Sequence, residues 1–294
     1  MSAETIHIAG RYNKYLRDLS QSPWIDKNDV RVKDSVQEMI EDGLHKFLSF
    51  EKSVFAGSGR EDVDVRMLGK GRPFAFKILN PKDVESYNDQ TLAQIHEFVN
   101  SKYSGKIRIR DLQIVTKNDV AKYLKEGQET KRKEYRALCC CSRRLTSADV
   151  EKINKITDLC IEQMTPIRVL HRRTWATRRR TIHRLRIDSV KLGDFDSISE
   201  ENLEHVFTLT MLTEAGTYIK EFVHGDFGRT EPNLSSLLGN CETDLMELDV
   251  MVSIDLLLLA FYLSADVSLH VTHINRCLLI FSTASQCALN FKGG

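Results

Sequence analysis

Apolar residues along the chain recur with two different periods, and each period predicts one kind of element. Apolar positions three and four residues apart indicate amphipathic helices, whereas alternating apolar and polar positions indicate half-buried strands. The first period predicts helices over residues 32–50, 90–103, 119–132, 149–158 and 215–228. The second period, with short apolar runs, predicts a strand ahead of the first helix and strands over 72–81, 106–116, 134–141, 158–166, 168–187, 205–214 and 243–250.

The order of these predicted elements indicates the fold class. Helices and strands do not follow the regular spacing of parallel βαβ units, and several successive strands have no helix between them. In the strand predicted over 106–116, Ile107 and Ile109 fall on one face while Arg108 and Arg110 fall on the other. We therefore expect an α+β protein in which a mixed or antiparallel central sheet is flanked by helices.

The last part of the chain differs in character from the rest. The full length of 294 residues allows one large domain or two small ones. Beyond residue 253, an uncharged and mainly apolar run lies between Asp255 and Asp266. A helix that crosses a membrane needs about 20 such residues, so this run predicts a packed tail or an extension rather than an anchor.

The cysteines predict no disulfide framework and no metal site. The seven cysteines include three in a row, Cys139 to Cys141, and no Cys-x-x-Cys pair occurs. Adjacent residues on a strand alternate between faces, so these three cannot converge on one ion. The first residues also lack the long apolar run of a secretory signal. We expect reduced cysteines and a location in the cytosol or the nucleus.

Charge is distributed unevenly along the chain, although the net charge is only +1. Residues 168–187 hold eight arginines, two histidines and no acid. The planar guanidinium fork suits phosphate, and Trp175 within the segment could stack on a base, which together predict nucleic-acid binding. The alternative is a solvated strand face whose arginines pair with acids from elsewhere in the chain.

A second charged segment, residues 57–74, contains candidate catalytic carboxylates. Asp62 and Asp64 lie between Arg60 and Arg66. If this stretch is extended, the four charges share one face and the two intervening valines face the core. An arginine within about 4–6 Å lowers the pKa of an aspartate by about 1–3 units, which suits a nucleophile or an electrostatic stabiliser rather than a general acid. A structural ion-pair ladder is the alternative, and the two-residue period does not separate one aspartate from the other.

The third candidate segment covers residues 216–239. Gly216 permits a sharp entry into the helix predicted there, and Tyr218, Phe222 and Leu237 are expected to face the core. The polar candidates of this segment are Lys220, His224 and Arg229. A lysine on a helix is usually solvated, so this segment alone indicates little.

Taken together, these segments resemble the archaeal and eukaryotic family of tRNA pseudouridine synthases that carry an accessory THUMP-containing N-terminal domain. The matching stretches are IHIAGRYNKYLRDLSQSPW, GREDVDVRMLGKGRPFAFKILNP, IRIRDLQIVT, KEYRALC, TPIRVLHRRTWATRRRTIH and TEAGTYIKEFVHGDFGRTEPN. The resemblance implies a catalytic domain over residues 1–252 and a divergent tail over residues 253–294. The zinc-binding accessory region of the family is not in the sequence, so we expect the catalytic domain alone.

The resemblance also implies a role for particular residues. The Gly-Arg-x-Asp pattern of several pseudouridine synthases identifies Asp62 as the catalytic residue, with Arg60 as its partner and Asp64 as a supporting neighbour. KEYRALC matches a motif whose tyrosine, here Tyr135, packs against the target base and assists proton removal. TYIK matches a motif whose basic residue, here Lys220, pairs with the catalytic aspartate. The remaining residues expected to contact the substrate are Tyr218, Leu237, Arg172, Arg173, Arg178 and Arg180.

The function implied by this resemblance is the isomerisation of uridine to pseudouridine in the T-arm loop of tRNA, at position 55 or 54. The implied reaction uses neither a cofactor nor a metal ion, and the catalytic domains of the family act as monomers. The alternative is a non-catalytic RNA-binding protein that keeps the synthase fold.

Overall fold

The computed structural model of the chain describes residues 5–23, 34–121, 124, 132–190, 198 and 203–253. Most of the helix expected over 119–132, and the tail beyond Ser253, lie outside the described residues.

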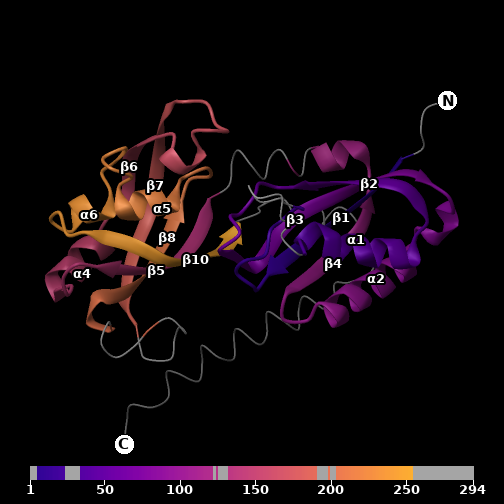
Figure 1. Cartoon of the computed structure of the whole chain (residues 1–294), viewed down its shortest axis with the longest axis horizontal. Coiled ribbons are helices and arrows are strands. Elements are labelled where there is room, and N and C mark those ends of the chain that lie inside the picture. Colours follow the sequence, from indigo (N-terminus) through magenta and orange to yellow (C-terminus); the bar gives the residue numbers. More distant parts are fainter. Residues whose placement is uncertain are drawn as a thin grey trace, which may run out of the picture. The chain divides into compact units, whose positions relative to one another are not determined.

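The described strands form one mixed sheet, in the order β4-β1-β3-β10-β5-β8-β7-β6-β9, with β2 pairing to β3 (Figure 1). Neighbouring strands pair antiparallel, except that the end of β10 runs parallel to the start of β3. The strands are β1 (Thr5–Lys14), β2 (Phe50–Gly57), β3 (Val65–Pro81), β4 (Ile107–Val115), β5 (Lys133–Cys141), β6 (Thr157–Met164), β7 (Thr177–Ser189), β8 (Val206–Thr213), β9 (Thr230–Glu231) and β10 (Thr243–Ser253). The expected α+β class is confirmed.

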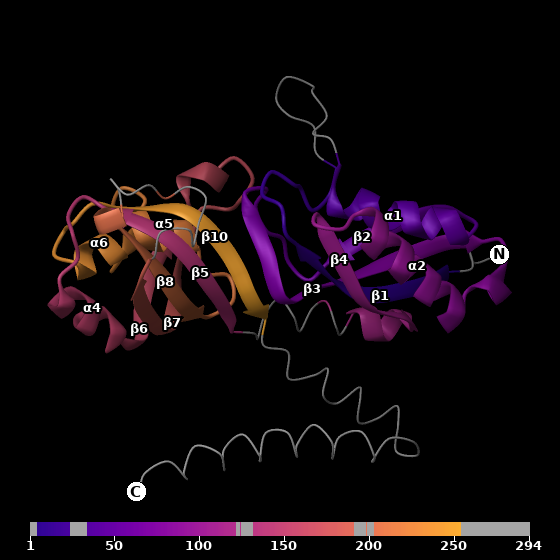
Figure 2. The ribbon, with the colours of Figure 1, turned by 90° about the horizontal axis from the view of Figure 1, so that it is seen from below.

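The helices pack on this sheet in two groups. The helices are α1 (Val36–Phe47), α2 (Asp89–Lys102), α4 (Ser147–Asn154), α5 (Ile219–His224) and α6 (Leu234–Leu237), with 3-10 turns η1 (Val84–Ser86), η2 (Ile167–Val169) and η3 (Leu203–His205). α1 and α2 pack on each other and on β2 and β4, whereas α5 packs on β10 and α6 (Figure 2). The second group positions the candidate site.

Local sequence explains where these helices begin and end. The side chain of Ser35 accepts a hydrogen bond from the Glu38 amide and caps α1. α4 begins with a capping box between Thr146 and Asp149. α5 ends at Gly225, which has φ +78° and therefore takes a left-handed conformation that favours glycine.

The strand predicted over 106–116 is confirmed as β4, and its expected faces are correct. Ile107 and Ile109 are buried, while Arg108 is exposed. The alternation expected for the three adjacent cysteines of β5 is also present. Cys139 and Cys141 belong to the main core, and Cys140 packs with a smaller cluster.

The condition of an extended segment over 60–66 is not met, because residues 58–64 form a loop and a turn and β3 begins at Val65. The Val65 amide donates to the Asp62 carbonyl at 3.1 Å, which closes the turn. Gly59 has φ +82°, so the chain bends where a strand would have to continue. The four charged residues therefore do not share one strand face.

The prediction of a single strand over 168–187 is correct only in its second half. η2 covers Ile167–Val169, and β7 does not begin until Thr177. The Thr165 amide donates to the Ala176 carbonyl at 2.9 Å, so the residues between them form the connection of the β6–β7 hairpin. The arginines of this segment are thus divided between a loop and a strand.

Three smaller differences concern element boundaries. The helix expected over 149–158 ends at Asn154, whose side chain binds both backbone groups of Ile187, and β6 begins at Thr157. The helix expected over 215–228 is limited to α5. The sequence patterns missed β2, which pairs with β3 along most of its length.

Candidate active site

Two aspartates of the loop between β2 and β3 meet two cations from distant parts of the chain. The Asp62 carboxylate accepts a hydrogen bond from Arg168 Nη1 at 2.8 Å. Lys220 Nζ lies 2.6 Å from Asp64 Oδ2 and 3.8 Å from Asp62 Oδ2. The Asp62 side chain is 35% exposed, so the ion-paired carboxylate remains accessible from solvent. This loop, η2 and α5 together form the candidate site.

α5 places its first residues at this site through a backbone anchor. The amide of Gln163 in β6 binds both the N–H and the carbonyl of Tyr218, each at 2.9 Å, immediately before the helix begins. Lys220 then reaches the two aspartates, and Glu221 turns inward with its side chain only 1% exposed. The helix therefore supplies one partly buried cation and one fully buried anion.

Arg168 connects that buried anion with Asp62. Its Nε atom lies 2.6 Å from Glu221 Oε1, while its Nη1 atom binds Asp62. Burial lowers the pKa of the Arg168 guanidinium, but the hydrogen bond and charge of Glu221 outweigh burial and raise it. One guanidinium therefore neutralises Glu221 and orients Asp62, as its planar fork permits.

Lys220 also keeps Asp64 ionised. Partial burial raises the pKa of the Asp64 carboxyl, but the hydrogen bond and charge of Lys220 outweigh it and hold the pKa below its usual value. The resemblance implied that Lys220 pairs with Asp62. In the structure Lys220 lies closer to Asp64, and Arg168 binds Asp62.

Tyr135 lies in the core of the sheet near this loop. On β5 it stands opposite Val250 of β10, and Val250 stands opposite Met67 of β3. Two strand spacings of about 4.8 Å therefore separate Tyr135 from Met67. Burial raises the pKa of Tyr135 to about 12, with the Arg72 charge acting against it. The phenol is thus protonated at neutral pH.

We expect Tyr135→Phe to fold as stably as the wild type and to slow the reaction proposed below by about 100-fold, the usual scale for a proton-transfer group. The hydroxyl has no hydrogen-bond partner among the described residues, so its removal leaves no donor or acceptor unsatisfied. Single-turnover rates and thermal unfolding measure the two effects. Because the pKa of Tyr135 is about 12, ionisation of this phenol should not change the wild-type rate at any pH up to about 11. A change of rate with pH that occurs below about pH 11 in the wild type and is absent from Tyr135→Phe would contradict this expectation.

Three other expected site residues lie outside this cluster of charges. Arg60 is exposed and has no ion pair with the residues that the structure describes. Tyr218 is half-buried at the start of α5. Leu237 is the last residue of α6, and its carbonyl accepts a hydrogen bond from Lys152 of α4 at 2.7 Å. The structure does not join these three to the ion pairs of Asp62.

Most arginines of residues 168–187 have carboxylate partners, which agrees in part with the alternative of a neutralised face. The pairs, besides those of Arg168, are Arg179–Glu162, Arg180–Glu214, Arg184–Glu134 and Arg186–Asp188. Within the described segments, Arg172, Arg173 and Arg178 have no acidic partner. Arg178 instead donates to Thr165 Oγ1 at 3.1 Å. Unneutralised charge is thus concentrated at the β6–β7 connection and the start of β7.

Sequence reasoning missed Arg168 and Glu221 as members of the site. Arg168 belongs to the arginine-rich segment, but no local pattern separates it from the other seven arginines. Its partner Glu221 follows directly after Lys220 on a short helix. A carboxylate beside a candidate catalytic lysine was the one signal that could have found it, and that signal is weak by itself.

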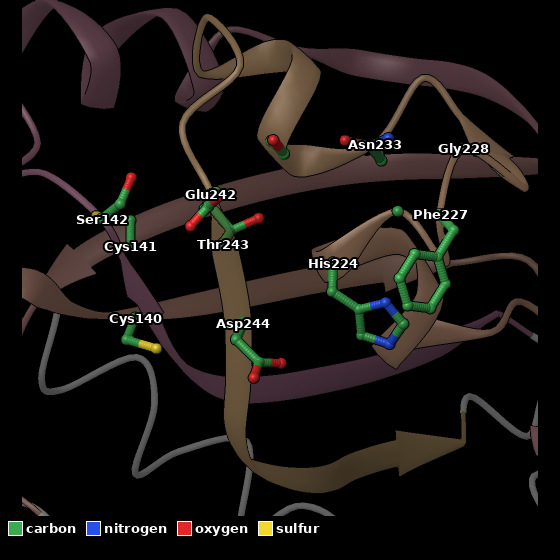
Figure 3. Close-up of a pocket in the computed structure, with 12 residues that line it drawn as sticks. Cys140, Cys141, Ser142, His224, Phe227, Gly228, Asn233, Glu242, Thr243 and Asp244 are labelled. Carbon is green, nitrogen blue, oxygen red and sulfur yellow. The ribbon is translucent and has the colours of Figure 1, made fainter.

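A separate pocket of 740 Å³ lies at the other end of α5 (Figure 3). Its walls include Phe227, Cys140, Asp244 and His224, a polar candidate of the sequence analysis, but none of the residues that the resemblance implies for the site. Across the described segments, no group of histidine, cysteine or acidic side chains has the geometry to hold a metal ion. No helix of those segments is long and apolar enough to cross a membrane.

The mixed sheet and the ion-paired loop define an α+β domain with a candidate active site centred on a carboxylate. The model of the family described as "Pus10, C-terminal" matches residues 7–255. The chain belongs to this family, and the family expected from the sequence motifs is confirmed.

Individual relatives agree with this assignment. The chain is 46% identical over 245 residues to the tRNA pseudouridine synthase Pus10 of Homo sapiens, covering 83% of this chain and 43% of that protein. It is 34% identical over 248 residues to the tRNA pseudouridine synthase Pus10 of Thermofilum pendens, covering 84% and 52% respectively. The chain therefore spans about half the length of the curated relatives it matches.

Among solved structures, a chain of a Cbf5-Nop10-Gar1 complex is similar with a TM-score of 0.44 and 15% sequence identity. The match covers 83% of this chain and 48% of that one.

Proposed function

We propose that the chain isomerises uridine to pseudouridine in the T-arm loop of tRNA, with Asp62 as the catalytic residue. The observation that carries this proposal is the accessible Asp62 carboxylate, which Arg168 binds at 2.8 Å while Lys220 lies 3.8 Å away. Two cations therefore stand beside the carboxylate that is proposed to act as nucleophile or base. The names of the curated relatives support the reaction class.

In the proposed reaction, the target uridine is flipped out of its loop, at a cost of a few kcal/mol in unstacking. Asp62 attacks the sugar, or abstracts a proton from it, and the N-glycosidic bond breaks. The freed uracil rotates within the site and is rejoined to the sugar through carbon 5, a step that breaks any bond Asp62 formed with the sugar or returns any proton it took. The proton then lost from carbon 5 is balanced by a proton gained at the ring nitrogen that left the sugar. Because substrate and product are isomers, the overall change consumes no oxidant, reductant or second substrate.

Within this scheme the neighbours of Asp62 orient its carboxylate rather than react. Arg168 and Lys220 hold it in one direction, and orientation of a reacting group is a major source of rate acceleration. The mainly buried ring of Tyr135 suits the wall of a pocket that keeps water from the detached uracil, and its hydroxyl is proposed to assist the removal of the proton from carbon 5.

The arginines without carboxylate partners are the proposed phosphate-binding residues. We expect Arg172→Ala and Arg173→Ala to weaken tRNA binding and to reduce the slope of log affinity against log salt by about 0.7–0.9 for each phosphate that is no longer neutralised. Arg179→Ala is the matched control, because the Arg179 side chain is 79% exposed but pairs with Glu162. Binding measured across a salt series checks this prediction, and an equal weakening in all three variants would contradict it.

The experiment that tests the proposed function incubates the chain with an unmodified tRNA transcript. Carbodiimide treatment followed by primer extension then scores pseudouridine at each position. A stop in the T-arm loop that requires the protein is the expected result. Binding of the transcript without product would favour the non-catalytic RNA-binding alternative, and the absence of both would overturn the proposal.

A further inference from the structure

Four side chains from outside the loop hold the backbone carbonyls of residues 58–64. Arg72 donates to the carbonyl of Ser58 at 2.8 Å, Gln21 to Gly59 at 3.1 Å, Lys14 to Asp62 at 3.2 Å and Val63 at 2.9 Å, and Arg17 to Asp64 at 2.9 Å. Lys14 lies at the end of β1 and Arg72 within β3. The loop that carries the two aspartates is therefore held at five of its seven carbonyls, three of them by side chains of the sheet.

Glu61 is the buried anion at the centre of these attachments. Its side chain is only 1% exposed, in contrast to the neighbouring Asp62. It accepts a hydrogen bond from Arg72 Nε at 2.5 Å and from the Tyr12 hydroxyl at 2.7 Å. The loop thus directs one carboxylate into the core and the next one toward solvent.

Two chains of hydrogen bonds begin at the Glu61 carboxylate and return to the loop just before it. The first passes through Arg72 to the Ser58 carbonyl. The second passes through the Tyr12 hydroxyl and the Gln21 amide to the Gly59 carbonyl. Because both routes close on the residues that precede Asp62, they fix the direction from which the Asp62 side chain leaves the backbone.

The hydrogen bonds of Arg72 depend on the negative charge of the Glu61 carboxylate. The Arg72 side chain is only 6% exposed, and an unpaired charge in that position is costly. Burial lowers the pKa of the Arg72 guanidinium, but the Glu61 charge outweighs it and raises the pKa above its usual value. Without the Glu61 carboxylate, Arg72 would have to turn toward water and release the Ser58 carbonyl.

We propose that Glu61 is a positioning residue that fixes the loop backbone and thereby aims the Asp62 carboxylate at the substrate. The proposal rests on the proposed function in assigning chemistry to Asp62. The fixing of the loop by Glu61 is independent of that assignment.

The test compares the wild-type chain with Glu61→Gln, which keeps the shape of the side chain and removes its charge. Hydrogen–deuterium exchange should show amides of residues 58–65 exchanging at least about tenfold faster in the variant. The single-turnover rate of pseudouridine formation should fall about 100-fold, the scale of a misplacement near 1 Å, while the Kd for tRNA stays within about threefold. Unchanged exchange in this segment, or an unchanged rate, overturns the proposal.

A second variant and a control separate positioning from general loss of stability. Tyr12→Phe breaks the chain of hydrogen bonds through Gln21 to Gly59 and leaves no buried charge unpaired. It should also speed the exchange of residues 58–65 and slow the reaction, each less than Glu61→Gln does. This variant tests the proposal even if Glu61→Gln does not fold. Asn100→Ala removes the bonds of the Asn100 amide to both backbone groups of Ile109, at 2.7 and 2.9 Å, away from the site. It should lower the Tm and leave both the loop exchange and the rate unchanged.

If Asn100→Ala slows the reaction as much as Glu61→Gln at an equal loss of Tm, the positioning role is overturned. If the wild-type chain forms no pseudouridine, the proposed function fails, and the exchange of residues 58–65 still decides whether Glu61 fixes the loop.

Discussion

Asp62→Asn is expected to reduce pseudouridine formation at least about 10⁴-fold, the scale seen when a catalytic nucleophile is removed, without weakening tRNA binding. The asparagine keeps the size of the side chain but has no anionic oxygen to attack the sugar or to accept a proton from it. Arg168 and Lys220 remain in place, so the surface that meets the RNA does not lose positive charge. Primer extension after carbodiimide treatment, together with tRNA binding, measures the two effects.

Asp64→Asn is the matched control for this prediction. Asp64 lies two residues further along the same loop and makes the shorter contact with Lys220, at 2.6 Å. Its side chain is 57% exposed, so the loss of this ion pair should hardly change stability. Lys220 can then move onto Asp62, and we expect activity to fall less than about tenfold. If Asp64→Asn is as inactive as Asp62→Asn, the catalytic role does not belong to Asp62 alone.

The parts of the fold that the sequence predicted well are those held by contacts close along the chain. The alternation of Ile107 and Ile109 with arginines predicts β4 correctly, because one face of that strand packs on the core. The helix expected over 215–228 was placed in the right segment but was too long, because α5 ends at Gly225, which takes a left-handed conformation.

The loop at residues 58–64 could not be predicted in the same way. Its alternating charges resemble a strand, but its shape is fixed by Lys14 and Arg72, which reach it from other parts of the sheet. Hydrogen bonds from a side chain to the backbone of a distant segment produce no periodic pattern in the sequence. Glu61 shows the same limit, since nothing local indicates that one acid of the loop is buried while the next is exposed.

Of the charged groups in the candidate site, the resemblance named Asp62 and Lys220, whereas it named Arg60 in place of Arg168 as the partner of Asp62. The motif resemblance, rather than charge spacing, separated Asp62 from Asp64. The role of Arg168 depends on Glu221, which lies 53 positions further along the chain and meets it only in the folded protein. The total number of arginines in a segment is therefore a poorer indicator of RNA binding than the number of arginines that have no carboxylate partner.

Arg168→Met is expected to slow the reaction about 10³-fold, the upper range for removing one electrostatic interaction from an active site. It should also lower the free energy of unfolding by about 2 kcal/mol. Breaking a fully buried ion pair costs about 3–5 kcal/mol, and solvent reduces this value because the Arg168 side chain is 37% exposed. The methionine leaves Glu221, which is 1% exposed, without its cation. Single-turnover rates and thermal unfolding measure the two effects.

The double variant Arg168→Met/Glu221→Gln separates the two roles of this arginine. The neutral glutamine removes the buried charge, so most of the missing stability should return. The rate should not return, because Asp62 still lacks the guanidinium that binds it at 2.8 Å, and Lys220 at 3.8 Å is shared with Asp64. Recovery of both would mean that Arg168 acts only as the partner of Glu221 and that Lys220 suffices for Asp62. Recovery of stability alone would assign Arg168 to the orientation of the catalytic carboxylate.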